Sequence, residues 1–114
     1  MDINYFKKEE VVRFFFSRDE IGKAYFFLKI AIKRQSEKGN PTPSLVDLEE
    51  ILDQIDSKTE KTCLEFYEEN KDLCVEFIMA MIEFSKKENI DTSPLNKLLF
   101  SINFSPSSFE NTLH

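Results

Sequence analysis

The sequence predicts an all-α fold, a small antiparallel bundle of four to six helices in a single domain spanning residues 1–114. Apolar residues recur every three to four positions along most of the 114 residues, which is the spacing of one face of an α-helix. Helix-capping patterns precede several of these runs. Glycine occurs only at Gly22 and Gly39. Because tight two-residue hairpins favour glycine, a meandering sheet is not expected.

The first element, residues 4–16, is predicted to be a helix, with a strand as the alternative. The stretch VVRFFF at residues 11–16 is rich in β-branched and aromatic residues, which are enriched in strands. The second helix is marked more clearly. Ser17-Arg18-Asp19-Glu20 has the form of a capping box, and apolar residues then repeat at helical spacing over residues 21–35. Residues 39–44 form a connector.

The second half of the chain is also predicted to be helical. Ser44 caps a third helix, and the capping pattern at residues 57–60 predicts a fourth that begins near Lys58. This fourth helix either continues to residue 86 or breaks and restarts with Asn70 as its cap. An apolar repeat of 3.5 residues favours one long or kinked helix.

The C-terminal part of the chain is expected to complete the bundle. A short last helix opens at residues 91–94, with Pro94 in its first turn. The tail, residues 103–114, is expected to dock on the domain through its apolar side chains.

Charge is distributed unevenly along the chain. Residues 1–40 carry nine Lys and Arg against six Asp and Glu, whereas residues 41–114 carry six against fifteen. An acidic helical surface either serves solubility or attracts a basic partner by electrostatic steering. The candidate interface carboxylates are Asp47, Glu49, Glu50, Asp53 and Asp56.

Aromatic residues are concentrated near the N-terminus, with eight of the fifteen in the first 27 residues. Consecutive residues of a helix point in different directions, so one small helical core does not easily bury two aromatic runs. The alternative is a Phe-rich core. The aromatic candidates for a protein interface, where such residues are enriched, are Phe14, Phe15, Phe16, Phe26 and Phe27.

Several kinds of chemistry are not expected. The single histidine is His114, so neither a Ser/His/Asp nor a Cys/His site can be assembled around it convincingly. A structural zinc site needs about four nitrogen or sulfur ligands, and the only thiols are Cys63 and Cys74. No glycine-rich phosphate-binding motif occurs. We therefore expect no enzymatic activity, no catalytic residues, no metal and no cofactor.

The expected location is the cytoplasm. No apolar run approaches the roughly 20 residues of a membrane-spanning helix, and the N-terminus does not read as a cleavable signal peptide. A non-cleaved export signal is left open.

These patterns favour a non-enzymatic protein–protein interaction module. The leading hypothesis is a small acidic inhibitor or regulator that binds and masks a functional surface of a larger protein. A basic surface on that protein would match the acidic charge of this chain. The first alternative is a nucleic-acid-binding regulator that uses basic N-terminal helices joined at residues 17–18, although the net charge of -6 disfavours it. The second is a homodimeric chaperone-like or structural subunit with the fourth helix at its core.

Overall fold

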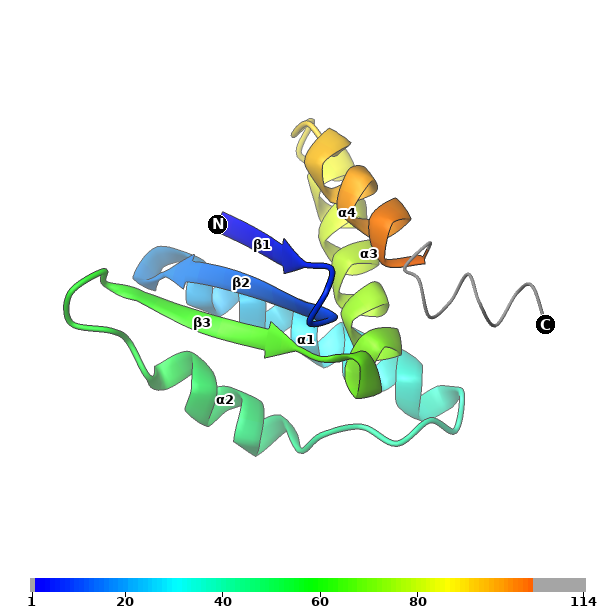
Figure 1. Ribbon diagram of the computed structural model, residues 1–114, viewed down its shortest axis with the longest axis horizontal. Coiled ribbons are helices and arrows are strands. Elements are labelled where there is room, and N and C mark those ends of the chain that lie inside the picture. Colours follow the sequence, from blue (N-terminus) through cyan, green and yellow to red (C-terminus); the bar gives the residue numbers. More distant parts are fainter. Residues whose placement is uncertain (1, 104–114) are drawn as a thin grey trace.

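The computed structural model describes residues 2–103 and shows a three-stranded antiparallel sheet with helices packed on one face (Figure 1). The prediction of an all-α bundle is therefore wrong. The expected docking of the tail concerns residues that lie almost entirely outside the described part. The elements are β1 (Asp2–Phe6), β2 (Val11–Ser17), α1 (Arg18–Glu37), α2 (Leu45–Asp53), β3 (Lys61–Phe66), the 3-10 turn η1 (Glu68–Asn70), α3 (Lys71–Lys87) and α4 (Ser93–Asn103).

The N-terminal hairpin forms without glycine because its turn is longer than a tight two-residue turn. Phe6 of β1 pairs with Val11 of β2, which leaves four residues, 7–10, in the connection. Glu10 takes the left-handed conformation that glycine often supplies, with φ of 53°. The scarcity of glycine therefore did not exclude a sheet, and the strand alternative for residues 11–16 is the correct one.

The third strand replaces the start of the predicted fourth helix. The capping pattern at residues 57–60 forms a turn instead, in which the Asp56 carboxylate accepts a hydrogen bond from the Lys58 amide at 2.9 Å. The chain then pairs with β2, placing Leu64 opposite Phe14. A continuous helix over residues 58–86 is thus wrong, and the helix restarts with Asn70 as N-cap, which was the alternative.

Helices α1, α2 and α4 begin close to where the sequence predicts them. At the start of α1 the Ser17 amide donates to the Glu20 carboxylate at 2.9 Å, as a capping box requires. Beyond its end, Gly39 has a φ of 79°, the usual role of glycine after a helix. Ser44 is the N-cap residue of α2, and α4 begins at Ser93.

The core lies between the inner face of the sheet and helices α1 and α3. Phe77 of α3 is fully buried at its centre and makes edge-on ring contacts with Phe14 at 5.2 Å and Phe16 at 6.2 Å. Most of the apolar side chains of α3 are buried within the chain itself, although Met79 remains 39% exposed. Within residues 2–103, no helix is both long and apolar enough to cross a membrane.

Candidate protein-interaction surfaces

The outer face of the sheet is not covered by a helix among the described residues (Figure 1). Side chains alternate between the two faces of a strand, so residues paired across the three strands share this face. A solvated sheet face is usually polar, yet this one mixes polar and apolar side chains. Its members are Asp2, Asn4, Phe6, Val11, Arg13, Phe15, Lys61, Cys63 and Glu65.

A groove of about 650 Å³ runs along this open face beside the end of α2. Its apolar lining comes from three elements, with Phe15 on β2, Cys63 on β3 and Ile51 on α2. Phe15 and Cys63 lie directly opposite each other in the strand pairing. The polar residues that line it are Asp2, Asn4, Gln54, Asp56, Thr59, Lys61 and Thr62.

Carboxylates predominate around the groove. Lys61 forms an ion pair with Asp2, which lowers the pKa of the Asp2 carboxyl and raises the pKa of the Lys61 ammonium. Asp56 adds a second carboxylate to the lining. Asp47 lies one helical turn before Ile51, on the same side of α2. The groove therefore combines an apolar floor with an acidic edge.

Arg13 occupies the middle of the open face and is held in place by its neighbours. Its guanidinium carbon lies 4.9 Å from the centre of the Phe6 ring, within the range of a cation–π contact. Its Nε is 3.6 Å from the Glu65 carboxylate, which accepts a hydrogen bond from the Tyr67 hydroxyl. These contacts join the three strands into one ordered surface.

The structure separates the five predicted aromatic interface residues. Phe14, Phe16 and Phe27 are buried in the core and are not exposed for binding. Phe14, Phe15 and Phe16 are separated because they lie on a strand, in which successive side chains point to opposite faces of the sheet. Phe15 alone of the three therefore faces outward. Phe26 lies on a different surface, the outward side of α1, and is 55% exposed.

The five predicted acidic residues do not form one surface either. Asp47, Glu50, Asp53 and Asp56 are exposed. Glu49 is half-buried and turned toward α1, where a hydrogen bond to its carboxylate raises the pKa of the Tyr25 hydroxyl. Only Asp56 lines the groove with Phe15. The sequence patterns do not single out Ile51 and Cys63. Cys63 reaches the groove through the pairing of β3 with β2, and Ile51 through the packing of α2 beside β3, where its carbonyl accepts a hydrogen bond from the Thr62 hydroxyl at 2.7 Å.

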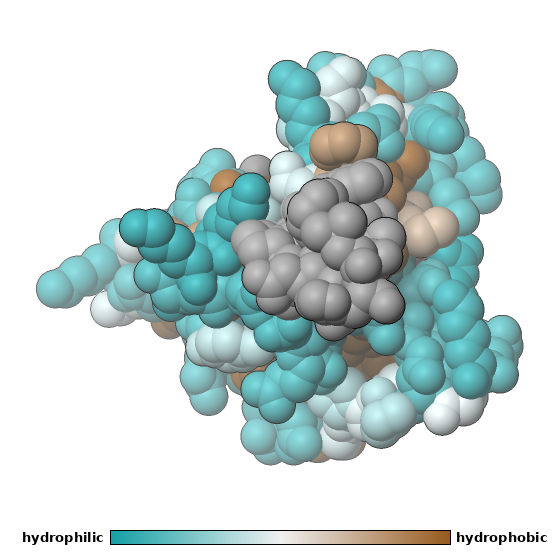
Figure 2. All heavy atoms as spheres, turned by 45° about the vertical axis from the view of Figure 1, so that its right-hand side comes forward, coloured by the Kyte–Doolittle hydropathy of each residue, from teal (hydrophilic) through white to brown (hydrophobic). Residues whose placement is uncertain are grey.

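The basic N-terminal part does not form a helix-turn-helix, because its first segment is the β1–β2 hairpin. Two cations near the end of α1 are engaged within the chain. The Lys38 ammonium lies 2.6 Å from the buried Glu76 carboxylate, and the Arg34 guanidinium lies 2.9 Å from Glu83. On the side shown in Figure 2, the coloured surface is mainly hydrophilic, with small apolar patches.

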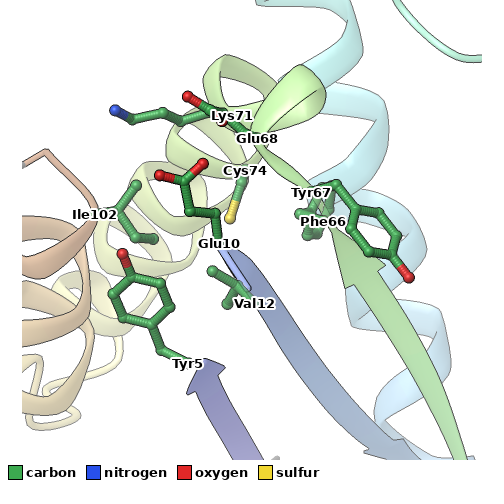
Figure 3. A pocket seen from close by; sticks show the side chains of 9 residues that line it. All are labelled: Tyr5, Glu10, Val12, Phe66, Tyr67, Glu68, Lys71, Cys74 and Ile102. Carbon is green, nitrogen blue, oxygen red and sulfur yellow. The ribbon is translucent and has the colours of Figure 1, made fainter. Parts of the chain in front are cut away.

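A small pocket lies between β1, β2 and the start of α3 (Figure 3). Tyr5, Glu10 and Cys74 are among the side chains around it, and its volume of about 30 Å³ suits one or two water molecules rather than an organic ligand. Burial raises the pKa of the Cys74 thiol to about 12, so this thiol stays protonated at neutral pH. Within residues 2–103, no three His, Cys, Asp or Glu side chains are grouped to hold a metal ion.

No protein-family model, curated protein sequence or solved structure matches this chain. Its function is therefore inferred from the chemistry of its own surfaces.

Proposed function

We propose that this chain is a non-enzymatic protein-binding module, a small acidic inhibitor or regulator that covers a functional surface of a larger protein with the open face of its sheet. The observation that supports this most is the groove whose floor is formed by Phe15, Cys63 and Ile51. Exposed apolar surface of this kind, bordered by polar residues, is typical of protein interaction sites.

The chemistry of the groove defines the partner it suits. An apolar side chain of the partner would enter between Phe15 and Ile51, displacing water from the groove floor. Basic residues around that side chain would face Asp56 and Asp47. The net charge of -6 adds long-range attraction to a basic surface, which raises the association rate more than the final affinity.

We place this activity in the cytoplasm. Both cysteines are free thiols, with Cys74 buried and Cys63 partly exposed on the open sheet face. Reduced thiols persist in a reducing compartment, whereas exported domains of this size often rely on disulfides. Fractionation of the producing cells with an antibody to the chain tests this location, and recovery of the chain outside the cytoplasm would contradict it.

The test compares two apolar positions on the same helix. Ile51, 37% exposed, lines the groove, whereas Val46, 60% exposed, does not. We would capture partners from lysate with the wild-type chain and with Ile51→Ser and Val46→Ser, and then measure the affinity of a purified candidate by calorimetry. We expect Ile51→Ser to weaken binding at least about tenfold, and Val46→Ser to leave it nearly unchanged.

Two further variants keep this test decisive. Phe15→Thr removes the aromatic ring but retains a residue that favours strands, and circular dichroism shows whether the fold is kept. Asp47→Lys reverses a charge at an exposed position, and we expect it to slow association with a basic partner. A partner that binds all of these variants as tightly as the wild-type chain would overturn the proposal.

A further inference from the structure

Strand β1 forms an edge of the sheet, and no other strand of the described chain lies on its far side (Figure 1). All of its residues pair with β2 in one unbroken register. The direction of its backbone groups follows from the pairing of β2 with β3, where Ser17 stands opposite Lys61. The Ser17 amide donates to the Glu20 carboxylate instead, at 2.9 Å. The Lys61 carbonyl accepts from the Asp56 amide at 3.0 Å, so Ser17 and Lys61 exchange no hydrogen bonds across the strands.

The hydrogen bonds of the sheet alternate outward from that pair. In an antiparallel sheet every second pair exchanges both of its N–H···O=C bonds. Phe14 accordingly bonds to β3, whereas Phe15 and Arg13 bond to β1. On β1, the N–H and C=O groups of Ile3 and Tyr5 therefore point away from the sheet. Within residues 2–103, no backbone group outside the sheet bonds to them, so this edge presents two donors and two acceptors.

The opposite edge of the sheet is protected, and the edge at β1 is not. α2 runs beside β3 (Figure 1), and its Ile51 carbonyl accepts a hydrogen bond from the Thr62 hydroxyl at 2.7 Å. Native proteins usually guard an edge with proline, lysine, a bulge or a covering element. The sequence DINYF of β1 contains no proline or lysine, and its pairing has no bulge. This edge is therefore suited to pairing with a further strand.

We propose that β1 pairs with β1 of a second copy of this chain, which joins two three-stranded sheets into one continuous sheet. An antiparallel pairing centred on Asn4 places Ile3 opposite Tyr5 of the second copy, and Tyr5 opposite its Ile3. Each of these pairs exchanges two hydrogen bonds, so all the outward-pointing groups of both edges are used. Moving the register by two residues leaves Ile3 or Tyr5 of each copy without a partner in β1.

The side chains of β1 suit this register. On the outer face, Asn4 meets Asn4 of the second copy, and Asp2 meets Phe6, which is 38% exposed. No like charges stand opposite each other, which matters for a chain with a net charge of -6. On the inner face, the half-buried Ile3 and Tyr5 form the pairing of β-branched and aromatic residues that stabilises sheets. Each contact occurs twice, as a symmetric dimer requires.

A second copy explains this edge better than a strand from another protein does. Because most proteins guard their edges, few of them offer an open strand, whereas every copy of this chain brings an edge of matching length and register. The two-fold axis is perpendicular to the sheet, so the outer faces of both copies lie on the same side. The dimer is thus compatible with the proposed function and does not depend on it.

Sedimentation equilibrium over a range of concentrations tests the dimer. The wild-type chain is expected to approach twice its mass of 13.4 kDa. Asn4 is exposed and lies on the two-fold axis, so Asn4→Lys places two positive charges opposite each other and should raise the dissociation constant at least about tenfold. Val46→Lys makes the same change of charge at an exposed position on α2, and it should dimerise like the wild type. Circular dichroism checks that each variant is folded.

Mixing two variants tests the two-fold position of Asn4. A fluorescently labelled Asn4→Lys chain should bind an Asn4→Asp chain at least about tenfold more tightly than it binds itself, because the introduced lysine then faces the introduced aspartate. A wild-type chain that stays monomeric, an Asn4→Lys variant that dimerises normally, or a mixture that associates no better than Asn4→Lys alone would overturn the proposal.

Amide hydrogen exchange measured by NMR tests the backbone pairing itself. The Ile3 and Tyr5 amides should exchange rapidly in dilute solution and become protected at concentrations where the mass is that of the dimer. Protection that does not change with dilution would show that the same chain covers this edge. Rapid exchange in the dimer would place the contact on another surface. Either result would overturn the proposal.

Discussion

The two faces of the sheet place the same kind of residue in different surroundings. On the inner face, Phe14 and Phe16 are buried against Phe77 and fix the helices to the sheet. On the outer face, Phe15 is only partly covered and lines an open groove. The three phenylalanines are consecutive, so composition does not distinguish them. Their roles follow from the alternation of side chains along a strand.

The largest difference between the faces is expected in stability. Phe14→Ala removes a fully buried ring that contacts Phe16, Phe66 and Phe77, and we expect a loss of about 3–5 kcal/mol in the free energy of unfolding. Phe15→Ala should cost clearly less, because part of that ring already faces water. Urea unfolding followed by circular dichroism measures both. Equal losses would show that the outer face is as closely packed as the inner face.

The two cysteines should differ in reactivity in the same way. Burial raises the pKa of the Cys74 thiol to about 12, so at pH 8 its thiolate is about a thousandfold scarcer than that of an ordinary thiol. Burial and the nearby Glu65 carboxylate also raise the pKa of Cys63, but this thiol is partly exposed. Both should react faster as the pH rises, and Cys63 should be alkylated first.

Mass spectrometry after a timed iodoacetamide reaction distinguishes the two sites. The Cys63→Ser variant is the control, and it should be labelled only on unfolding. Rapid labelling of Cys74 in the folded chain would show that its thiol is accessible to solvent.

A smaller effect is expected at the ion pairs. Lys38→Met leaves the buried Glu76 carboxylate without its contact at 2.6 Å, although Arg34 remains 3.7 Å away. We expect a loss of about 1–3 kcal/mol. Asp2→Asn breaks the exposed pair with Lys61 on the outer face, where solvent screens the charges, and should cost less. Thermal unfolding at low and high salt compares them, and a larger loss for Asp2→Asn would reverse the expected ranking.

The sequence predicted those parts of the structure that depend on local signals. The capping box at Ser17 and the cap at Ser44 identified α1 and α2 because a helix start is specified within a few residues. A strand at residues 11–16 was only the alternative, and β3 was missed altogether, because β3 is defined by its pairing with β2, about fifty residues away in the chain. The residues of the candidate site likewise could be predicted only in part, because some of them come together through contacts between distant parts of the chain. Phe15 was identified from its aromatic run, but Cys63 joins it only through this long-range pairing, and Ile51 only because α2 packs beside β3.

The smallest effect is expected at the turn that leads into β3, and it separates stability from binding. Glu60 has a φ of 56°, a left-handed conformation that costs a residue with a side chain roughly 1–2 kcal/mol. Glu60→Gly removes this strain. Glycine also increases the backbone entropy of the unfolded chain, which offsets part of the gain. We therefore expect a net stabilisation of roughly 0.5–1 kcal/mol. Chemical denaturation measures it, with Glu69→Gly in η1 as a control that has no such strain to release.

Glu60→Gly leaves the pairing of β3 with β2 unchanged, because the Asp56 amide still donates to the Lys61 carbonyl at 3.0 Å. Phe15 and Cys63 therefore stay opposite each other, and binding of a partner through the open face should not change. If the variant is more stable but binds more weakly, the turn itself belongs to the contact surface. The groove would then extend beyond Asp56 and Thr59 along the loop into β3.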